Sequence, residues 1–470
     1  MAGNHGTGYT ASNSGVTTGG VLAQLIALGA ADTHLTNEPE VTFWRLHVQK
    51  STNFAIESIT QGFTGSATFG GTGTLTLNRT GDLVYWMYVI VDLPAIYGEQ
   101  SAGHVTTYGH ADVSCDACED GNEDLCGEHV VEEDDPIVVD SSIDQCNGLK
   151  KPYANWVNEI GHAVLARVNF AIGGQCIDTV HTQFLHAWEE LSGKPGKRLE
   201  EMIGKRFTRA QLVNDSQRDR TLYIPVPFYF TRHSGNALPL VSLQFHSVAI
   251  EVTFAPLAAL VQVSDEDVKV YKCAQGGDLV ANDLNARVDT TYVYLDMEER
   301  DRFAVGSFQQ LITQVQHHTT SHTGLSANFQ INFNHPALEL IWMYQRECHA
   351  VANNVFNFSG KYGRDPIRRV ALQINNLTRF DREAQYFRMV QPWQHHTSIP
   401  RSYVYCYCFA LEPESSHPSG TLNFSRIDNV NMQFTKDSSI SSENGNFYVF
   451  ARSWNILRFK EGLGGILYSN

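Results

Sequence analysis

Four cysteines lie close together in one acidic stretch, and their side chains are of the type that binds zinc. They are Cys115, Cys118, Cys126 and Cys146, out of nine cysteines in the chain. Cys115 and Cys118 form a C-x-x-C pair, and thiolates at this spacing chelate zinc. The seven and nineteen residues that separate the other members do not match a common zinc module. Two interpretations stay open: a loop pinned by zinc or by disulfides, and free thiols in a mobile loop.

The same stretch places carboxylates in an order that resembles a calcium-binding loop. Asp116, Asp120 and Asp124 fall on alternating ligand positions. However, Cys118 takes the third position, and Gly127 stands where the motif needs a bidentate glutamate. No helix-forming segment flanks the loop, so these residues argue against a calcium site.

Two histidine pairs, His317–His318 and His395–His396, also invite a metal interpretation. Adjacent side chains on a strand point to opposite faces, which is unsuitable for one metal ion. We therefore predict polar loop or rim residues at both pairs. The chain contains no nucleophile elbow, phosphate-binding loop, dinucleotide fingerprint or zinc-protease motif. Catalytic residues are thus not predicted, although carboxylates brought together from distant strands of a β-sandwich hydrolase stay open.

The elements that would position these residues are mostly strands. Residues 83–91 are apolar on both faces, which predicts a strand buried on both sides. Residues 221–230 alternate apolar and polar and contain two prolines, which predicts an edge strand. In residues 241–254 the apolar phase shifts by one residue, which predicts a β-bulge near His246 and Ser247.

A charged, helix-forming stretch at 297–305 separates two runs of strand patterns. No alternation of strands with long helices is present, so a parallel α/β fold is not expected. The pattern predicts an all-β chain of two successive β-sandwiches that divide near residue 300. The strands predicted after the connector are 308–316, 325–334, 337–345, 368–376, 403–411, 420–434 and 447–459.

The charge of the chain is concentrated in one segment. The net charge is −16 over 470 residues, and residues 111–146 hold thirteen acidic residues with no Lys or Arg, which leaves −3 for the rest. Nucleic-acid binding needs clustered cations, so neither part favours it. The one basic cluster, 194–207, is interleaved with acids and is interpreted as a solvated helix face. We expect a soluble protein from a reducing compartment, because a basic leader, a membrane-length apolar run and a disulfide framework are all missing.

Two segments are predicted to lie outside the sandwiches. Residues 1–20 are rich in Gly, Ser and Thr and nearly uncharged, so we expect a flexible N-terminal arm that orders only against a partner. Residues 95–155 form an acidic, cysteine-rich insertion too long for an ordinary hairpin loop, and we expect it at the surface. Only 18% of residues are charged, which suggests that a second domain or other subunits cover much of the surface.

Several blocks of the sequence, in order along the chain, resemble the major capsid proteins of nucleocytoplasmic large DNA viruses, most closely the marseillevirus-like branch. The blocks are GGVLAQLIALGAADTHLTNEPEVTFWR (19–45), STNFAIESITQGFTG (51–65), ALPLVSLQFHSVAIEVTF (237–254), YVYLDMEERDRFA (292–304), YVYCYCFALEPESSHPSGTLNFSRIDNVNMQF (403–434) and NILRFKEGLGGILYSN (455–470).

This resemblance implies two consecutive eight-stranded jelly-roll β-sandwiches, the first at 21–299 and the second at 300–470. It implies a structural protein that forms a homotrimeric, pseudo-hexagonal capsomer in the virion shell after assembly in the host cytoplasm. Implied partners are neighbouring capsomers, minor capsid and penton proteins, internal membrane proteins and host glycans, with no direct contact to nucleic acid. The acidic insertion departs from the family pattern, so its role does not follow from the resemblance.

The resemblance also assigns the start of the first roll. Residues 40–45 are expected to form its first strand and residues 52–58 the partner strand, with Phe43, Trp44, Phe54 and Ile56 packing the unit. The alternatives that stay open are a minor or penton capsid protein, a glycan-binding β-sandwich protein of the virion surface, and a β-sandwich hydrolase. No cofactor is expected apart from the zinc considered for the 115–146 loop.

Overall fold

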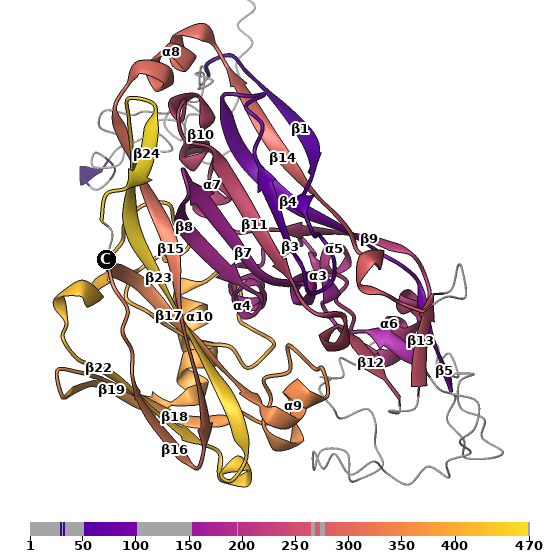
Figure 1. Ribbon diagram of the computed structural model, residues 1–470. Coiled ribbons are helices and arrows are strands. Elements are labelled where there is room, and N and C mark those ends of the chain that lie inside the picture. The colour runs from indigo at the N-terminus through magenta and orange to yellow at the C-terminus, as the bar shows by residue number, and fades with distance from the viewer. Residues whose placement is uncertain are drawn as a thin grey trace, which may run out of the picture. The chain divides into compact units, whose positions relative to one another are not determined.

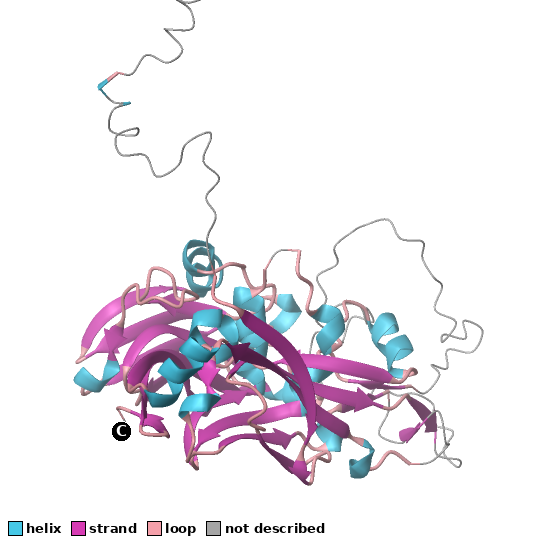
Figure 2. Ribbon diagram, turned by 90° about the horizontal axis from the view of Figure 1, so that it is seen from above, coloured by secondary structure: helices cyan, strands magenta, loops and turns pink. Residues whose placement is uncertain are grey.

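The computed structural model describes residues 29–30, 32, 51–100, 153–194, 196–264, 268–272 and 278–468. Strands dominate the described residues, and short helical segments connect them (Figure 2). The segment 1–20 that is expected to form a flexible arm, the expected strand at 40–45 with Phe43 and Trp44, and nearly all of the acidic insertion lie outside the described residues.

The first roll consists of two antiparallel sheets that pack face to face (Figure 1). One sheet has the order β1 (Phe54–Gly62), β14 (Asn285–Leu295), β4 (Leu83–Leu93) and β10 (Leu238–Pro239), and β9 (Arg220–Pro225) also pairs with β4. The opposite sheet has the order β2 (Thr64–Gly65), β3 (Thr72–Thr76), β11 (Val248–Phe254), β7 (Leu165–Ile172) and β8 (Gln175–His181). We call these the outer and the inner sheet of the first roll.

Two-stranded ribbons and short helices extend the first roll. The ribbons pair β12 (Val261–Val263) with β6 (Ala154–Trp156), and β13 (Val268–Lys272) with β5 (Ile96–Gln100). The helices are α3 (Ile160–Val164), α4 (Thr182–Ser192), α5 (Glu200–Ile203), α6 (Arg209–Ser216) and α7 (Tyr229–Arg232). Helix α4 follows β8 directly, and this places it beside the inner sheet.

Helix α8 (Met297–Val305) connects the two rolls and lies at one end of them (Figure 1). Asp296 caps its first turn through Oδ1, which accepts from the Met297 amide, and Glu298 and Glu299 follow at the positive end of the helix dipole. Gly306 follows the last helical residue. The helix predicted at 297–305 is therefore confirmed.

The second roll repeats the strand order of the first. Its first sheet has the order β15 (Phe308–Thr323), β23 (Asn444–Lys460), β17 (Pro336–Arg346) and β20 (Tyr405–Cys408), with β21 (Leu422–Asn423) on β17 and β24 (Leu463–Ile466) on β23. Its second sheet has the order β16 (Ser326–Gln330), β22 (Val430–Lys436), β18 (Ile367–Ile374) and β19 (Leu377–Glu383). Helical segments are α9 (Glu347–Val351), a π-helical turn (Tyr386–Val390) and α10 (Gln391–His395).

In each roll the first strand pairs with a strand near the end of that roll, β1 with β14 and β15 with β23, and the sheets interleave strands from distant parts of the sequence. This is the double jelly roll, so the predicted all-β fold class is confirmed. The apolar interiors follow the two-residue period of the strands: Val168, Phe170 and Ile250 of the inner sheet face Val89 and Val288 of the outer sheet, all fully buried.

Two strand predictions need correction. The strand predicted at 221–230 ends at Pro225 and chain residues 226–228 lead into α7, because the second proline has no amide to donate to a ladder. Residues 241–247 are not a bulged strand but a 3-10 turn (Leu240–Ser242) and a loop. The change of apolar phase near His246 therefore marks the start of β11, not a bulge.

Among the described residues, no helix has the length and apolar character needed to cross a membrane.

Candidate functional site

The inner sheet and α4 of the first roll pack against the first sheet of the second roll. Phe184 of α4 contacts Phe450 of β23 with ring centroids 5.6 Å apart. The ring centroids of His181 in β8 and His317 in β15 are 4.4 Å apart. The Val315 amide donates to Asp178 Oδ1 at 2.9 Å. Fully buried side chains from both rolls belong to one continuous apolar cluster. We call this contact the inter-roll joint.

Burial on both faces distinguishes β17, the third strand of the sheet at the joint. All its residues from Ala337 to Arg346 are buried. Leu340 and Trp342 face the interior of the second roll, whereas Ile341 and Met343 face the first roll. The joint therefore covers what would otherwise be an apolar outer surface of the second roll.

An arginine from each roll lies over the indole ring of Trp188 in α4. The guanidinium carbons of Arg232 and Arg452 are 4.4 and 4.1 Å from the ring centroid. Arg232 belongs to α7 of the first roll and Arg452 to β23 of the second. Desolvated cation–π contacts are worth about 2 kcal/mol or more, so Trp188 helps to fix the two rolls together.

A buried ionic network surrounds Lys205 on the first-roll side of the joint. Lys205 Nζ lies 2.6 Å from both Glu159 Oε1 and Glu190 Oε1. Glu159 Oε2 is 2.6 Å from His186 Nδ1, and His186 Nε2 lies 3.0 Å from Ser402 Oγ of the second roll. Glu190 Oε2 also accepts from a backbone amide of the second roll, that of Arg401, at 2.6 Å. The network is therefore shared by both rolls.

The charges in this network support one another. Burial would raise the pKa of Glu159, but the positive charges of His186 and Lys205 hold it well below its usual range. Burial would likewise lower the pKa of Lys205, but Glu159 and Glu190 raise it. Glu159, His186 and Glu190 could in principle ligate a metal. Lys205 already supplies the positive charge between the carboxylates.

A second buried network lies behind β17 and β20. Glu339 accepts from Arg452 Nη1 at 2.5 Å through Oε1, and its Oε2 lies 2.8 Å from His396 Nε2. His396 Nδ1 lies 3.0 Å from Glu414 Oε1. Burial would lower the pKa of His396, but Glu339, Cys408 and Glu414 raise it to about 12. Burial would raise the pKa of Glu339, but His396 and Arg452 hold it at about 2.

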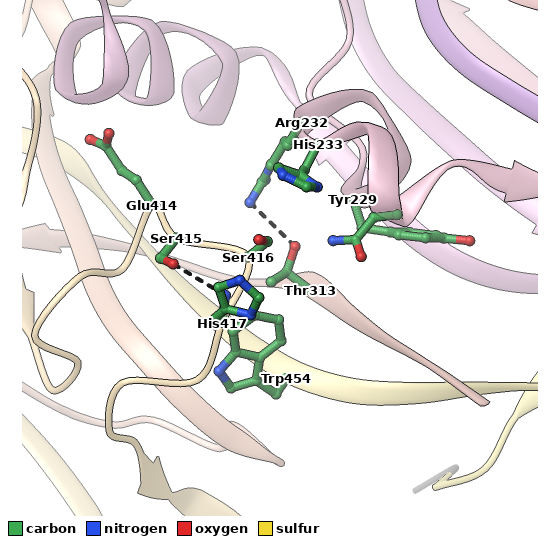
Figure 3. Close-up of a pocket in the computed structure, with 10 residues that line it drawn as sticks. Tyr229, Arg232, His233, Thr313, Glu414, Ser415, Ser416, His417 and Trp454 are labelled. Carbon is green, nitrogen blue, oxygen red and sulfur yellow. Dashed lines mark hydrogen bonds between the residues drawn. The ribbon is translucent and has the colours of Figure 1, made fainter. Parts of the chain in front are cut away.

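A cavity of about 320 Å³ opens at the joint (Figure 3). Its lining comes from both rolls: Tyr229, Arg232, His233 and Asn236 from the first, and Thr313, Glu414, Ser415, Ser416, His417 and Trp454 from the second. Arg232 Nη1 donates to Thr313 Oγ1 across it at 3.2 Å. Figure 3 shows the Glu414 carboxylate turned away from Arg232, which agrees with its bond to His396.

His162 gives the joint a predicted sensitivity to acid. It is 1% exposed, its ring packs edge-on against Phe356 of the second roll, and burial lowers its pKa from 6.5 to about 4. The unfolded chain therefore binds a proton between pH 6.5 and 4 that the folded chain does not, so stability falls as the pH falls through this window. The loss reaches about 3 kcal/mol once both states are protonated.

Denaturant unfolding of the native chain and of His162→Leu at several pH values measures this effect. We expect the slope of unfolding free energy against pH to be smaller in His162→Leu, by up to one proton between pH 6.5 and 4. Equal slopes in the two proteins would show that His162 does not titrate as described.

The outer sheet of the first roll presents an uncovered apolar face. Trp86 of β4 is 43% exposed and Tyr223 of β9 is 44% exposed. On β1, Phe54 and Ile56 are 52% and 58% exposed. β4 occupies the same position in its sheet as β17 does in the second roll, but no described segment covers Trp86 as the first roll covers β17.

The helical segment after β19, which consists of the π-helical turn Tyr386–Val390 and α10, is the second exposed surface. It follows the edge strand of the second roll just as α4 follows β8 in the first roll. Phe184 and Trp188 of α4 are packed in the joint, whereas Met389, Val390 and Trp393 are exposed, Trp393 by 76%. Each roll thus carries a sheet face and a helical segment of the same kind. Within the chain, the helical segment of the first roll packs against the sheet face of the second, whereas the sheet face of the first roll and the helical segment of the second stay exposed.

These surfaces correct two sequence predictions. Residues 83–91 are not buried on both sides in the single chain, because Trp86 faces outward. Phe54 and Ile56 do not pack the interior, because β1 is exposed along most of its length. The edge position predicted for the strand at 221–230 is confirmed for β9, which ends the outer sheet beside β4.

For the histidine pairs, the opposite orientation expected of adjacent residues on a strand is confirmed for His317 and His318, but these two residues lie within β15 and not in a loop. His317 and His318 point to opposite faces of β15, toward Phe450 and Phe329 respectively. His396 is not a rim residue, since its side chain is 0% exposed. Lys205, in the segment interpreted as a solvated helix face, is 16% exposed and ion-paired. The zinc candidates Cys115, Cys118, Cys126 and Cys146 lie outside the described residues.

Sequence reasoning missed both ionic networks. Glu159, Lys205 and Glu339 occupy no recognisable motif, and their partners come from distant parts of the chain. The one local signal is the spacing of His186 and Glu190, which puts both on one face of α4.

Comparisons with known proteins agree over nearly the whole chain. The family described as "Major capsid protein N-terminus" matches residues 42–296, and "Large eukaryotic DNA virus major capsid protein" matches residues 299–465. The major capsid protein of Pyramimonas orientalis virus is 31% identical, covering 96% of this chain and all of the relative. That of Phaeocystis pouchetii virus is 29% identical with the same coverage.

Solved structures show the same fold. The Faustovirus major capsid protein aligns with a TM-score of 0.68 at 13% identity, covering 92% of this chain and 94% of that one. A chain of the PBCV-1 virus capsid aligns with a TM-score of 0.67 at 23% identity, covering 91% of this chain and all of that one.

Proposed function

Because this chain belongs to the major capsid proteins of large eukaryotic DNA viruses and is a structural component of the virion shell, we propose that it builds that shell as a closed trimer. In this trimer the exposed face of the outer sheet, around β4 and β9 of one chain, packs against the helical segment after β19 of the neighbouring chain. Three chains, each with two rolls, then form a ring of six similar units.

The inter-roll joint carries this proposal. Within one chain, the helix that follows β8 packs against the outer surface of the sheet that contains β17. The equivalent helix after β19 and the equivalent sheet around β4 are both left uncovered. Repeating the same contact between chains would cover both, and such head-to-tail contacts form a closed ring when the rotation closes.

The chemistry of the two surfaces suits a permanent contact. Trp86 and Tyr223 on one side and Trp393 and Met389 on the other are large, exposed side chains of the types that dominate interface energies. An isolated soluble chain would expose these patches to water, and a partner of the same sequence removes that cost.

The role we propose is structural and not catalytic. The Lys205 network fixes the two rolls to each other, whereas the Glu339 network lies within the second roll. Glu159 and Glu190 are paired with Lys205, and Glu339 is paired with Arg452. Contacts with minor capsid and penton proteins, internal membrane proteins and host glycans stay predictions from the family resemblance, as does the marseillevirus-like assignment.

A photo-crosslinking amino acid placed at position 393 tests the geometry of the trimer. Irradiation of the purified protein is expected to join position 393 to peptides from β4 or β9 of another chain, identified by mass spectrometry. The same amino acid at position 297, in the exposed first turn of α8, serves as the control and should not reach these strands. Crosslinks from position 393 to any other surface of a neighbouring chain would refute this arrangement.

A further inference from the structure

Four side chains of the second roll converge in a way that the structural role does not explain. His396, Cys406 and Cys408 have ligand atoms that all lie within 4.8 Å of one another. Glu339 Oε2 lies 2.8 Å from His396 Nε2 and 3.9 Å from Cys408 Sγ. All four side chains are buried or nearly so. From this geometry we propose that Glu339, His396, Cys406 and Cys408 form a structural zinc site.

The pairing of β17 with β20 brings three of the four proposed ligands together. Cys408 pairs directly with Glu339 across the β17–β20 ladder, and Cys406 pairs with Ile341. Cys406 and Cys408 are two residues apart on one strand, so both thiols and the Glu339 carboxylate share one face of the sheet. His396 follows α10 and brings its imidazole over this face. Three ligands thus come from a rigid ladder and the fourth from the end of a helix.

The distances suit a tetrahedral ion. Bonds of about 2.3 Å to sulfur and about 2.0 Å to nitrogen or oxygen place tetrahedral ligand atoms roughly 3.3–3.8 Å apart. His396 Nε2 lies 3.5 Å from Cys408 Sγ, and Cys408 Sγ lies 3.9 Å from Glu339 Oε2. The 2.8 Å between Glu339 and His396 must open by about 0.5 Å to admit the ion, and Cys406 Sγ lies within 4.8 Å of the His396 and Cys408 ligand atoms.

Residues around the proposed ligands hold His396 and Glu339 in the orientation that zinc binding needs. His396 Nδ1 lies 3.0 Å from Glu414 Oε1, which orients the ring and leaves Nε2 toward the thiols. Thr397 holds Glu414 in turn through its backbone amide at 2.9 Å. Arg452 Nη1 donates to Glu339 Oε1 at 2.5 Å, so Glu339 Oε2 is the oxygen that would bind the metal.

The charges of the ion, its four ligands and Arg452 sum to zero when the ion binds, and Glu414 stays a carboxylate that accepts from His396 Nδ1. Zn²⁺ would displace one proton from His396 and one from each thiol, and no electron is transferred. Two thiolates and Glu339 then offset the ion, and the positive charge of Arg452 compensates the remaining negative charge of this set. Zinc would tie α10 and the loop that carries Glu414 to β17 and β20.

The soft donor set distinguishes this site from the other buried group of potential ligands. Thiolate and imidazole favour zinc over calcium or magnesium. In the other group, Glu159, His186 and Glu190, Lys205 already lies between the carboxylates and no thiol is present.

Elemental analysis of variants tests the site and separates it from the cysteines at 115–146. A variant with Cys115, Cys118, Cys126 and Cys146 all changed to Ser, produced with zinc in the medium, is expected to keep one zinc per chain. Adding Cys406→Ser and Cys408→Ser should remove that zinc, whereas adding Cys176→Ser and Cys348→Ser as the matched control should not. A four-serine variant without zinc, or a Cys406→Ser/Cys408→Ser variant that keeps it, overturns the proposal.

X-ray absorption at the zinc edge keeps the proposal testable if the Cys406→Ser/Cys408→Ser variant does not fold. In the four-serine variant we expect a shell of two sulfur and two nitrogen or oxygen ligands. A shell with only nitrogen and oxygen, or with four sulfurs, would exclude this set of residues.

Discussion

Replacing Lys205 with methionine is expected to lower the free energy of unfolding by about 3–5 kcal/mol, because it leaves buried carboxylates without their cation. Lys205 Nζ lies 2.6 Å from Glu159 and from Glu190, and Glu159 is 1% exposed. Methionine keeps an unbranched side chain and lacks only the terminal charged group, so the loss reports mainly the charge. Chemical denaturation of the purified variant measures the change.

Lys197→Met is the matched control, because Lys197 lies on the same segment and is exposed. We expect a change within about 0.5 kcal/mol there. A double variant, Lys205→Met with Glu159→Gln, should recover part of the loss, since one of the two stranded carboxylates is gone and only Glu190 stays without its cation. If Lys205→Met is no less stable than Lys197→Met, the network does not hold the joint together.

Replacing Trp393 with glutamate is expected to convert the assembled protein into folded monomers at micromolar concentration. Trp393 is 76% exposed in the single chain, so the change costs the fold little. In the proposed trimer it would place a carboxylate in an apolar contact at each of the three interfaces. Interface tryptophans contribute about 2 kcal/mol or more each, and the buried charge adds a desolvation penalty.

Met297→Glu serves as the control for this substitution. Met297 is 75% exposed, it begins α8 at the end of the rolls, and glutamate is favourable in the first turn of a helix. This variant should assemble like the native chain. Light scattering on both variants gives their masses, and a Trp393→Glu protein that stays assembled would remove this turn from the interface.

The strands could be predicted from the sequence because their interiors follow a two-residue period. The helix at 297–305 could be predicted because its cap and charges are local. The loop at 243–247 could not, since its apolar residues, such as Leu243, pack into the core without forming a strand. Periodicity alone does not distinguish a buried loop from a bulged strand.

The joint and the uncovered faces could not be located from sequence for a different reason. The stretch 83–91 is more apolar than 337–345, which contains Glu339 and Gln345. Nevertheless β17 is covered on both faces and Trp86 of β4 is exposed. Which strand is covered depends on how the rolls pack, and the pattern of a single strand does not contain that information. Likewise, Glu339 and Arg452 are 113 residues apart in sequence.

The mass of the purified chain in solution, measured by light scattering during size-exclusion chromatography and again after dilution to nanomolar concentration, tests the central claim most directly. Three chains of 52.5 kDa predict a particle of about 158 kDa that persists on dilution. A folded, stable species of 52.5 kDa would contradict the proposed trimer.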